Sequence, residues 1–354
     1  MPRLPFRGSL RRPPRAGRAA AAHRGAAVDD ARRDLSPWPP HPVGARLAGP
    51  ETPLPPELLN TPAGVPVVLG PTAAGKSRLA FELALALGAE VVVADSRQVY
   101  RRLEIATNKP PPEDRARVRY HGLDLAGPEA GFNVHLYVAA VAPVLRSGRR
   151  VIVEGGTNLY VDALMDGLTL GGVPPRPARR AELARLSTAE LGTLARELEP
   201  GLELDFSNRV RLERAIELLE AAGPPLARLR ARTPPPWKAI RVGLELPPEE
   251  LAERIRERSR RQLERGLVEE TRAALESGVP AGSQALSGTG YAEAVAFLQG
   301  RVTDAELLPL MVRNNRRLAK RQLTWLRRDA RIRWFRAGPE ALPAILNYLE
   351  GTLT

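Results

Sequence analysis

Short apolar runs alternate with amphipathic stretches along residues 65–246. The runs are rich in β-branched side chains, as the buried strands of a parallel sheet are. Four such runs occur, at Val65–Leu69, Val91–Ala94, Arg150–Val153 and Ile240–Leu246. Arg78–Leu87, which Gly88 ends, and Leu136–Arg146 have helical character. Strands that alternate with helices predict a doubly wound α/β sheet.

After residue 247 the pattern changes to charged helices. Pro248–Ser277 is predicted to be one long helix, because its apolar residues recur at roughly helical spacing. Further helices are expected at Gly290–Leu298 and Thr303–Leu326, and a closing strand at Arg331–Phe335. Helices without intervening strands predict an all-helical part of the molecule.

These patterns divide the chain into three parts. Residues 1–62 carry Pro-Pro pairs and Arg clusters without a regular period, so we expect a disordered extension. Its composition is also typical of a transit peptide, but the prolines would break an amphipathic helix, which favours a disordered tail or a mis-assigned start codon. Residues 63–246 and 316–340 are expected to form the α/β core, which an all-helical insertion at 247–315 interrupts.

Composition excludes several classes of site. The chain has no cysteine and only four histidines, which excludes disulfides and thiolate zinc sites and argues against a histidine-rich metal centre. No run reaches the about 18 apolar residues of a membrane span, and we expect a cytoplasmic protein. The net charge of +13 favours a polyanionic partner. GC-rich coding remains an alternative explanation, because all but four basic residues are arginine.

The strongest local signal is Gly70-Pro71-Thr72-Ala73-Ala74-Gly75-Lys76-Ser77, which matches GxxxxGK(S/T) between a predicted strand and a predicted helix. Its backbone N–H groups and the helix N-terminus can surround phosphate oxygens. Lys76 supplies a charge for the terminal phosphates, and Ser77 is the expected Mg²⁺ ligand. The motif predicts a P-loop NTPase-like core with a diphosphate or triphosphate site, rather than a glycine-rich turn with a chance lysine.

Two more loops follow predicted strands at the same edge of the sheet. Asp95-Ser96-Arg97-Gln98-Val99-Tyr100 begins with a carboxylate that is placed to bind Mg²⁺ or to act as a general base. A helix N-cap without chemistry is the alternative for Asp95. Glu154-Gly155-Gly156-Thr157-Asn158-Leu159-Tyr160 permits close backbone approach to a ligand, although Gly-Gly-Thr alone is often only a turn. Three such loops together predict a ligand site.

Two stretches are predicted to be basic helices. Asn208–Leu219 places Arg211 and Arg214 on one face. Arg313–Arg328 is denser, with Arg313, Arg316, Arg317, Lys320, Arg321, Arg327 and Arg328. A solvated charged face is the usual explanation for such runs, but like charges this dense repel one another, and contacts with phosphates would relieve that cost.

In chain order these motifs resemble the tRNA dimethylallyltransferase (tRNA isopentenyltransferase) family. GPTAAGKS is similar to that family's GPT-A-S-GKT/S loop, DSRQVY to its DS-x-Q-VY and VEGGTNLY to its VGGT-x-LY. The likeness extends to IATNKP, RLERAIELLEAAGPPL, LERGLVEETRAAL, GTGYAE and NNRRLAKRQLTWLRR. It runs from about Val65 to Phe335.

The resemblance implies transfer of a dimethylallyl group from dimethylallyl diphosphate to the N6 amine of adenosine 37 in tRNA. Thr72–Ser77 would hold the diphosphate with Mg²⁺, and Asp95 would be the general base. Thr157 would contact the substrate at the reacting centre, and Arg214, with Arg180, would help to hold the diphosphate. The insertion would grip the anticodon stem of the tRNA, and a monomer is expected. Contacts with the tRNA around the flipped base are implied for Asp95, Ser96, Arg97, Gln98, Thr157, Arg180, Val210, Arg211, Leu212, Glu213 and Arg214.

The chain departs from the family pattern at several positions. Glu154 replaces a small or apolar residue and adds a charge close to the site, and Asn108 stands where the family usually has Ala. The segment 172–208 looks shortened, and Phe206-Ser207-Asn208 replaces the usual Pro-Asn-Asp, which weakens the assignment of Arg180.

Two other activities use the same loops. A P-loop small-molecule kinase would need the phosphate loop and Mg²⁺ but not the basic helix at 313–328. An adenylate isopentenyltransferase would prenylate free AMP, ADP or ATP. The long insertion and the basic helices favour tRNA as the acceptor. A non-enzymatic RNA-binding protein would leave Lys76, Ser77 and Asp95 without a purpose.

Overall fold

The computed structural model describes residues 64–168, 173, 176–229 and 232–353, so the extension expected at 1–62 lies outside the described residues. Within these ranges a six-stranded parallel sheet has the order β3-β2-β4-β1-β5-β6. The strands are β1 (Val65–Leu69), β2 (Glu90–Val93), β3 (Tyr120–His121), β4 (Val151–Glu154), β5 (Ala239–Glu245) and β6 (Arg333–Arg336). The predicted α/β sheet is therefore confirmed, and β3 is an addition to it.

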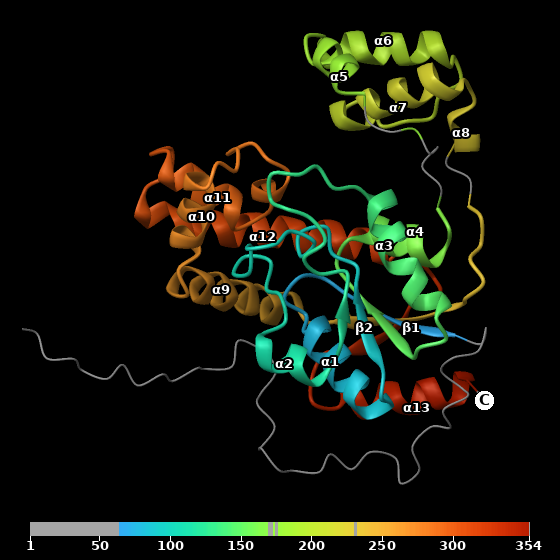
Figure 1. The fold of residues 1–354 in the computed structure, drawn as a ribbon, viewed down its shortest axis with the longest axis vertical. Helices are drawn as coiled ribbons and strands as arrows, with labels where there is room; N and C mark the ends of the chain where they lie inside the picture. Colours follow the sequence, from blue (N-terminus) through green and yellow to red (C-terminus); the bar gives the residue numbers. More distant parts are fainter. Residues whose placement is uncertain (1–63, 169–172, 174–175, 230–231, 354) are drawn as a thin grey trace, which may run out of the picture. The chain divides into compact units, whose positions relative to one another are not determined.

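Helices cover both faces of the sheet (Figure 1). On one face, α1 (Lys76–Leu87) and α13 (Ala341–Leu353) lie side by side in a core that includes Val68. On the other face, α3 (Val134–Arg146) and α4 (Asn158–Met165) pack together in a core that includes Val67. Val67 and Val68 enter different cores because successive residues of a strand point to opposite faces. The continuous apolar pattern of β1 thus reflects burial on both sides.

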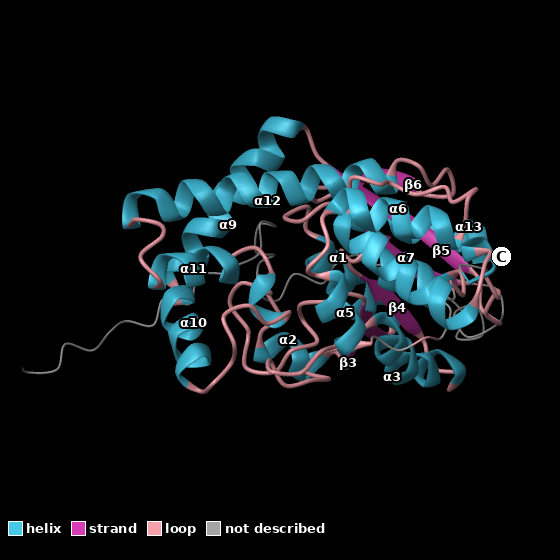
Figure 2. Ribbon diagram, turned by 90° about the horizontal axis from the view of Figure 1, so that it is seen from above, coloured by secondary structure: helices cyan, strands magenta, loops and turns pink. Residues whose placement is uncertain are grey.

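The helices expected after residue 247 are present, with one correction. The single helix predicted at Pro248–Ser277 is wrong, because two helices, α9 (Pro248–Glu264) and α10 (Leu267–Glu276), occupy this stretch. The break falls at Gly266, whose φ of 90° favours glycine. The other helices are α11 (Tyr291–Leu298) and α12 (Asp304–Leu326), and α9 lies beside α12 (Figure 2).

Four further helices form a hydrophobic core of their own. They are α5 (Pro177–Leu183), α6 (Thr188–Leu198), α7 (Arg209–Ala222) and α8 (Leu226–Leu229). Leu183, Leu191 and Leu212 are fully buried in this core. A short helix, α2 (Pro112–Arg117), lies between β2 and β3 in the chain. No helix within the described ranges is long and apolar enough to cross a membrane.

Candidate functional site

The phosphate loop connects β1 to α1, as its motif predicts. Gly70 has a φ of 150°, and a Cβ atom there would lie 2.8 Å from the carbonyl oxygen of Leu244, so this close approach to β5 requires glycine. Gly75, with a φ of 97°, leads into the first turn of α1, whose N–H groups have no partner within the helix. The Lys76 ammonium donates to the carbonyl oxygen of Pro71 at 2.9 Å. The loop therefore gathers N–H groups and one cation where a phosphate group needs them.

Glu154, one of the departures from the family pattern, lies against the phosphate loop. It ends β4, the neighbour of β1, and its Oε1 accepts a hydrogen bond from the Ser77 hydroxyl at 3.2 Å. Only 2% of the residue is exposed. Burial, helped by the charge of Asp95, raises the pKa of Glu154 to about 7, although Lys76 and the Ser77 hydrogen bond oppose the rise. The same burial lowers the pKa of Lys76, which the Glu154 carboxylate counteracts.

The loops after β2 and β4 are joined through Thr157. Its hydroxyl accepts a hydrogen bond from the backbone N–H of Ser96 at 3.0 Å and donates to the Ser96 hydroxyl at 3.2 Å. Asp95 Oδ1 accepts from the backbone N–H of Arg97 at 2.8 Å, so the carboxylate also stabilises its own turn. A Cβ atom on Gly156 would lie 3.9 Å from Asp95 Oδ2. The structure thus brings Asp95, Ser96 and Thr157 together.

Gln322 of α12, which was not among the predicted site residues, connects two of these loops. Its Oε1 accepts from the backbone N–H of Thr72 at 2.8 Å, and its Nε2 donates to the carbonyl oxygen of Gly156 at 2.8 Å. A side chain on Gly156 would displace it, since a Cβ atom there would lie 2.7 Å from Nε2. Gln322 therefore positions the phosphate loop relative to the loop that carries Thr157.

Replacing Gln322 by Leu is expected to weaken binding of inorganic diphosphate about tenfold, because a nearly isosteric side chain leaves two partly buried backbone groups without their partner. Calorimetric titration with pyrophosphate measures this. Gln322→Glu keeps the acceptor for Thr72 and loses the donor to Gly156, so its loss should be smaller. Gln299→Leu, at an exposed glutamine, is the matched control. Equal affinities of Gln322→Leu and this control would contradict a positioning role.

Two arginines of α9, neither of them a predicted site residue, have buried N–H groups that could bind an anion. Arg258 donates to Asn315 Oδ1 at 3.1 Å, while its buried Nε has no partner among the described residues. Arg254, one turn earlier, likewise has a buried Nη1 without a partner in the described part of the chain. Burial lowers the pKa of Arg258 to about 10, against the attraction of Asp95. Buried guanidinium N–H groups without an acceptor are costly, so an anion beside them would stabilise both.

Arg180 and Arg214 do not meet the phosphate loop through any contact among the described residues. Both guanidinium groups pair with Glu217 of α7, at 2.8 Å for Arg180 and 3.3 Å for Arg214. Arg214 also donates to the carbonyl oxygen of Val173 at 2.7 Å. Burial tends to raise the pKa of Glu217, but hydrogen bonds from Arg180, the Arg176 backbone and Arg214 lower it below the usual value. The structure gives these arginines a role within α5–α8, and their contacts with substrate stay a prediction.

Replacing Glu217 by Gln is expected to destabilise α5–α8 by about 1–3 kcal/mol, because three donors lose a buried charged acceptor. Hydrogen exchange of α7 at pH 7 measures this. Glu203→Gln, at an exposed residue between α6 and α7, is the control. The depressed folded pKa means that the stabilisation is present above the unfolded pKa and is lost as the pH falls through the folded one. The difference between wild type and variant should therefore shrink in acid; a difference that does not change with pH would contradict this.

The remaining residues of the predicted tRNA site differ in exposure. Val210 and Arg211 are exposed, Glu213 pairs with Arg209 at 2.8 Å, and the Leu212 side chain is buried in the core of α5–α8. Arg97 donates to the Gln284 carbonyl and, at 3.1 Å, to the Ser287 hydroxyl, both from the insertion. Gln98 is buried, and its Oε1 has no partner within the described ranges.

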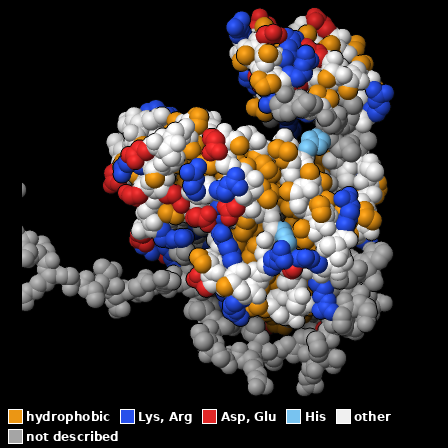
Figure 3. All heavy atoms as spheres, in the orientation of Figure 1, with side chains coloured by type: hydrophobic (Ala, Val, Ile, Leu, Met, Phe, Trp, Pro, Cys, Tyr) orange, Lys and Arg blue, Asp and Glu red, His pale blue; other side chains and the backbone are white. Residues whose placement is uncertain are grey.

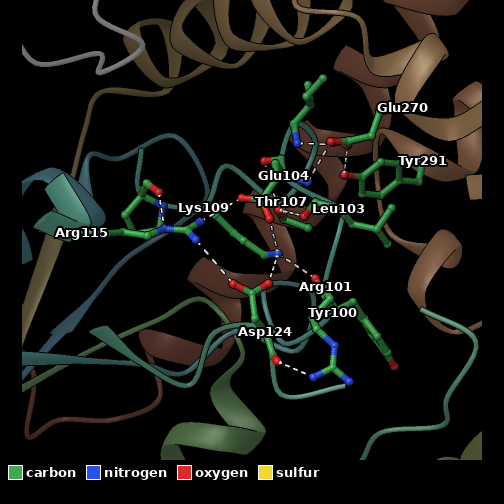
Figure 4. Close-up of polar contacts among 12 residues, drawn as sticks. Tyr100, Arg101, Leu103, Glu104, Thr107, Lys109, Arg115, Asp124, Glu270 and Tyr291 are labelled. Carbon is green, nitrogen blue, oxygen red and sulfur yellow. Dashed lines mark hydrogen bonds and ion pairs between the residues drawn. The ribbon is translucent and has the colours of Figure 1, made fainter. Parts of the chain in front are cut away.

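A buried lysine holds the end of the Asp95–Tyr100 segment (Figure 4). The Lys109 side chain is 0% exposed, and its ammonium donates to the Tyr100 carbonyl, to Glu104 and to Asp124 at 2.6–2.7 Å. Arg115 bridges the same two carboxylates. Glu270 of α10 accepts from the backbone N–H groups of Glu104 and Ile105 at 3.0 and 3.1 Å and from the Tyr291 hydroxyl. The network therefore joins the Asp95–Tyr100 segment to the insertion.

The basic residues of α12 differ from those of α9 in their partners. On α9, Arg254 pairs with Glu250, and Arg260 and Arg261 pair with Glu257. Figure 3 shows acidic and basic side chains interspersed over α9–α11. Seven basic residues, five on α12 and two directly after its end, are exposed, and within the described residues none forms an ion pair: Arg313, Arg316, Arg317, Lys320, Arg321, Arg327 and Arg328. Such a row of cations suits a polyanion.

Comparison with known proteins gives consistent matches. The family model described as IPP transferase matches residues 98–329. A tRNA dimethylallyltransferase of Thermomicrobium roseum is 38% identical over 289 residues, or 78% of this chain and 87% of the relative. The solved tRNA isopentenylpyrophosphate transferase of Bacillus halodurans is 30% identical, with a TM-score of 0.62 over 82% of this chain and 97% of that one. A eukaryotic dimethylallyltransferase acting on tRNA, 22% identical, shares the fold at a TM-score of 0.67 over 78% of this chain and 74% of that one.

Proposed function

Because the chain belongs to the IPP transferase family, we propose that it transfers a dimethylallyl group from dimethylallyl diphosphate to the N6 amine of adenosine 37 in tRNA. One observation carries the proposal: the phosphate loop, Asp95 and Thr157 lie at one edge of the sheet, held together by Ser96 and Gln322. A site for a diphosphate thus adjoins a carboxylate that can accept a proton.

Asp95, the phosphate loop and Thr157 have separate roles in the reaction. The amine nitrogen attacks the first carbon of the allyl group, the bond from that carbon to the diphosphate oxygen breaks, and Asp95 takes the proton that the nitrogen releases. The departing diphosphate gains negative charge, so the N–H groups of the loop, Lys76 and Arg258 bind the transition state more strongly than the ground state. The hydroxyl of Thr157 holds Ser96 and so fixes the turn that carries Asp95.

Magnesium fits the same place. Mg²⁺ prefers oxygen ligands and is usually held by one or two side chains together with substrate phosphates. Ser77, which faces a carboxylate oxygen at 3.2 Å, would hold it. When bound, the ion supplies positive charge to the leaving diphosphate. No group of three or more His, Cys, Asp or Glu in the described part of the chain offers a separate metal centre.

The unpaired basic row of α12 supports tRNA as the acceptor rather than a free nucleotide. A polyanion offsets the repulsion among seven like charges on and directly after one helix, and its binding weakens steeply with salt. Anticodon loops also make it inexpensive to unstack the reacting base, which must leave the loop to reach the buried centre.

A transfer assay tests the proposal. Purified protein, Mg²⁺ and radiolabelled dimethylallyl diphosphate are mixed with unmodified tRNA, AMP and ATP as competing acceptors. Label in tRNA, mapped by nuclease digestion to adenosine 37, is the expected result. Label in AMP or ATP would place the chain with the adenylate isopentenyltransferases. Transfer of the γ-phosphate of ATP without any prenylation would overturn the proposal in favour of a kinase.

A further inference from the structure

Glu154 occupies a position at which the motif of the tRNA dimethylallyltransferase family has a small or apolar residue. It ends β4, and its register partner on β1 is Val68, two residues before the phosphate loop. The carboxylate is therefore built into the rigid end of a central strand and not into a mobile loop. Its hydrogen bond to Ser77 aims it at the first turn of α1.

Among the described residues no cation pairs directly with the buried carboxylate, although the charge of Lys76 attracts it. Within the described residues it accepts a hydrogen bond from Ser77 and forms no ion pair. The Lys76 ammonium is bonded instead to the Pro71 carbonyl. Buried carboxylates are costly unless they are paired or bind a metal ion. A diphosphate entering this loop would meet a nearby negative charge and make the cost greater.

We propose that Glu154 is a second protein ligand of the magnesium ion at Ser77, directly or through a water, and that it makes diphosphate binding depend on the metal. The inference rests on the proposed function, since it takes the diphosphate to be the bound anion. In P-loop proteins the loop Ser or Thr and an acidic residue of a neighbouring strand hold the ion together. Here β4 neighbours β1, and the oxygens of Ser77 and Glu154 are 3.2 Å apart, so one ion can be bound between them and the phosphates.

Two opposite effects of the same charge follow. With Mg²⁺ present, the Glu154 carboxylate attracts the ion and so strengthens binding of the diphosphate. Without the ion, the carboxylate repels the diphosphate directly. A glutamate that served only as a hydrogen-bond acceptor for Ser77 would not change the sign of its effect with the metal.

The test uses inorganic pyrophosphate as the anion and Mn²⁺ as a spectroscopic substitute for Mg²⁺. Free and bound Mn²⁺ are distinguished by electron paramagnetic resonance, with the full-length protein at saturating pyrophosphate. Glu154→Gln should weaken Mn²⁺ binding about tenfold or more, since even the loss of an outer-shell partner lowers the affinity of a metal site about 10–100-fold. In EDTA at pH 9, the same variant should bind pyrophosphate several times more tightly than wild type, measured by calorimetry. Glu154→Asp should restore part of the Mn²⁺ affinity.

Controls separate the possible failures. Glu90→Gln removes a carboxylate at the opposite end of the adjacent strand β2 and should leave both affinities unchanged. Glu154→Ala, close to the family pattern, provides a second variant, and thermal unfolding shows whether each variant is folded. Unchanged Mn²⁺ affinity in folded Glu154 variants would overturn the inference while leaving the diphosphate site in place. Wild-type protein that binds no pyrophosphate under either condition would instead overturn the proposed function.

Discussion

Replacing Asp95 by Asn is expected to slow prenyl transfer about a thousandfold while changing pyrophosphate affinity little. General-base catalysis by a positioned side chain contributes about 10²–10⁴ in rate. The amide oxygen of Asn can still accept the hydrogen bond from the Arg97 N–H, so the turn after β2 should keep its shape. What the variant loses is the ability to take a proton. Single-turnover transfer of labelled dimethylallyl to tRNA measures the rate, and calorimetry measures the affinity.

A matched control variant shows whether the loss of any carboxylate charge would slow the transfer. Asp304→Asn removes an exposed carboxylate at the start of α12, on the same element as Gln322 but away from the site. Its rate should equal that of wild type. If Asp95→Asn slows transfer less than about tenfold, another group, such as the departing diphosphate, takes the proton. If it weakens pyrophosphate binding as much as it slows transfer, Asp95 acts on the donor and not on the amine.

The three loops of the site could be predicted from the sequence because a simple rule covers them. Each follows a short apolar run, and ligands of open α/β sheets bind beyond the carboxyl ends of the strands. Asp95, Thr157 and the phosphate loop needed no knowledge of distant parts of the chain. Gln322 was beyond such reasoning, since its partner Thr72 is 250 residues away and a glutamine in a basic helix looks like any exposed polar residue.

Other differences had visible signals. Gly266 interrupts the stretch predicted as one helix, and glycine is the residue that a positive φ favours, but the apolar spacing continues on both sides of it. Glu217 follows Arg214 by three residues, the spacing of a helical ion pair, so its competition for the arginine could have been foreseen. Its bond to Arg180 could not, because that bond depends on how α5 packs on α7.

Replacing Lys109 by Met is expected to lower the free energy of unfolding by about 2–4 kcal/mol. All three N–H groups of the ammonium are used, by the Tyr100 carbonyl and the carboxylates of Glu104 and Asp124. Removing one partner of a buried charge pair costs about 3–5 kcal/mol. The expected loss of unfolding free energy is smaller here because Glu104 and Asp124 are partly exposed and keep Arg115 as a partner. Chemical denaturation gives the value, with Lys238→Met, at an exposed lysine, as the control.

The location of the loss matters as much as its size. The Lys109 ammonium donates to the carbonyl oxygen of Tyr100, the last residue of the segment that begins at Asp95. The backbone N–H of Glu104 in turn donates to the Glu270 carboxylate of the insertion. Hydrogen exchange should therefore increase first in residues 100–108 and at the N-terminal turn of α10, before the sheet is affected. Prenyl transfer should fall through misplacement of the acceptor adenosine, with pyrophosphate affinity kept, since the phosphate loop has no bond to this network among the described residues. A loss below about 1 kcal/mol would mean that Arg115 alone holds the two carboxylates.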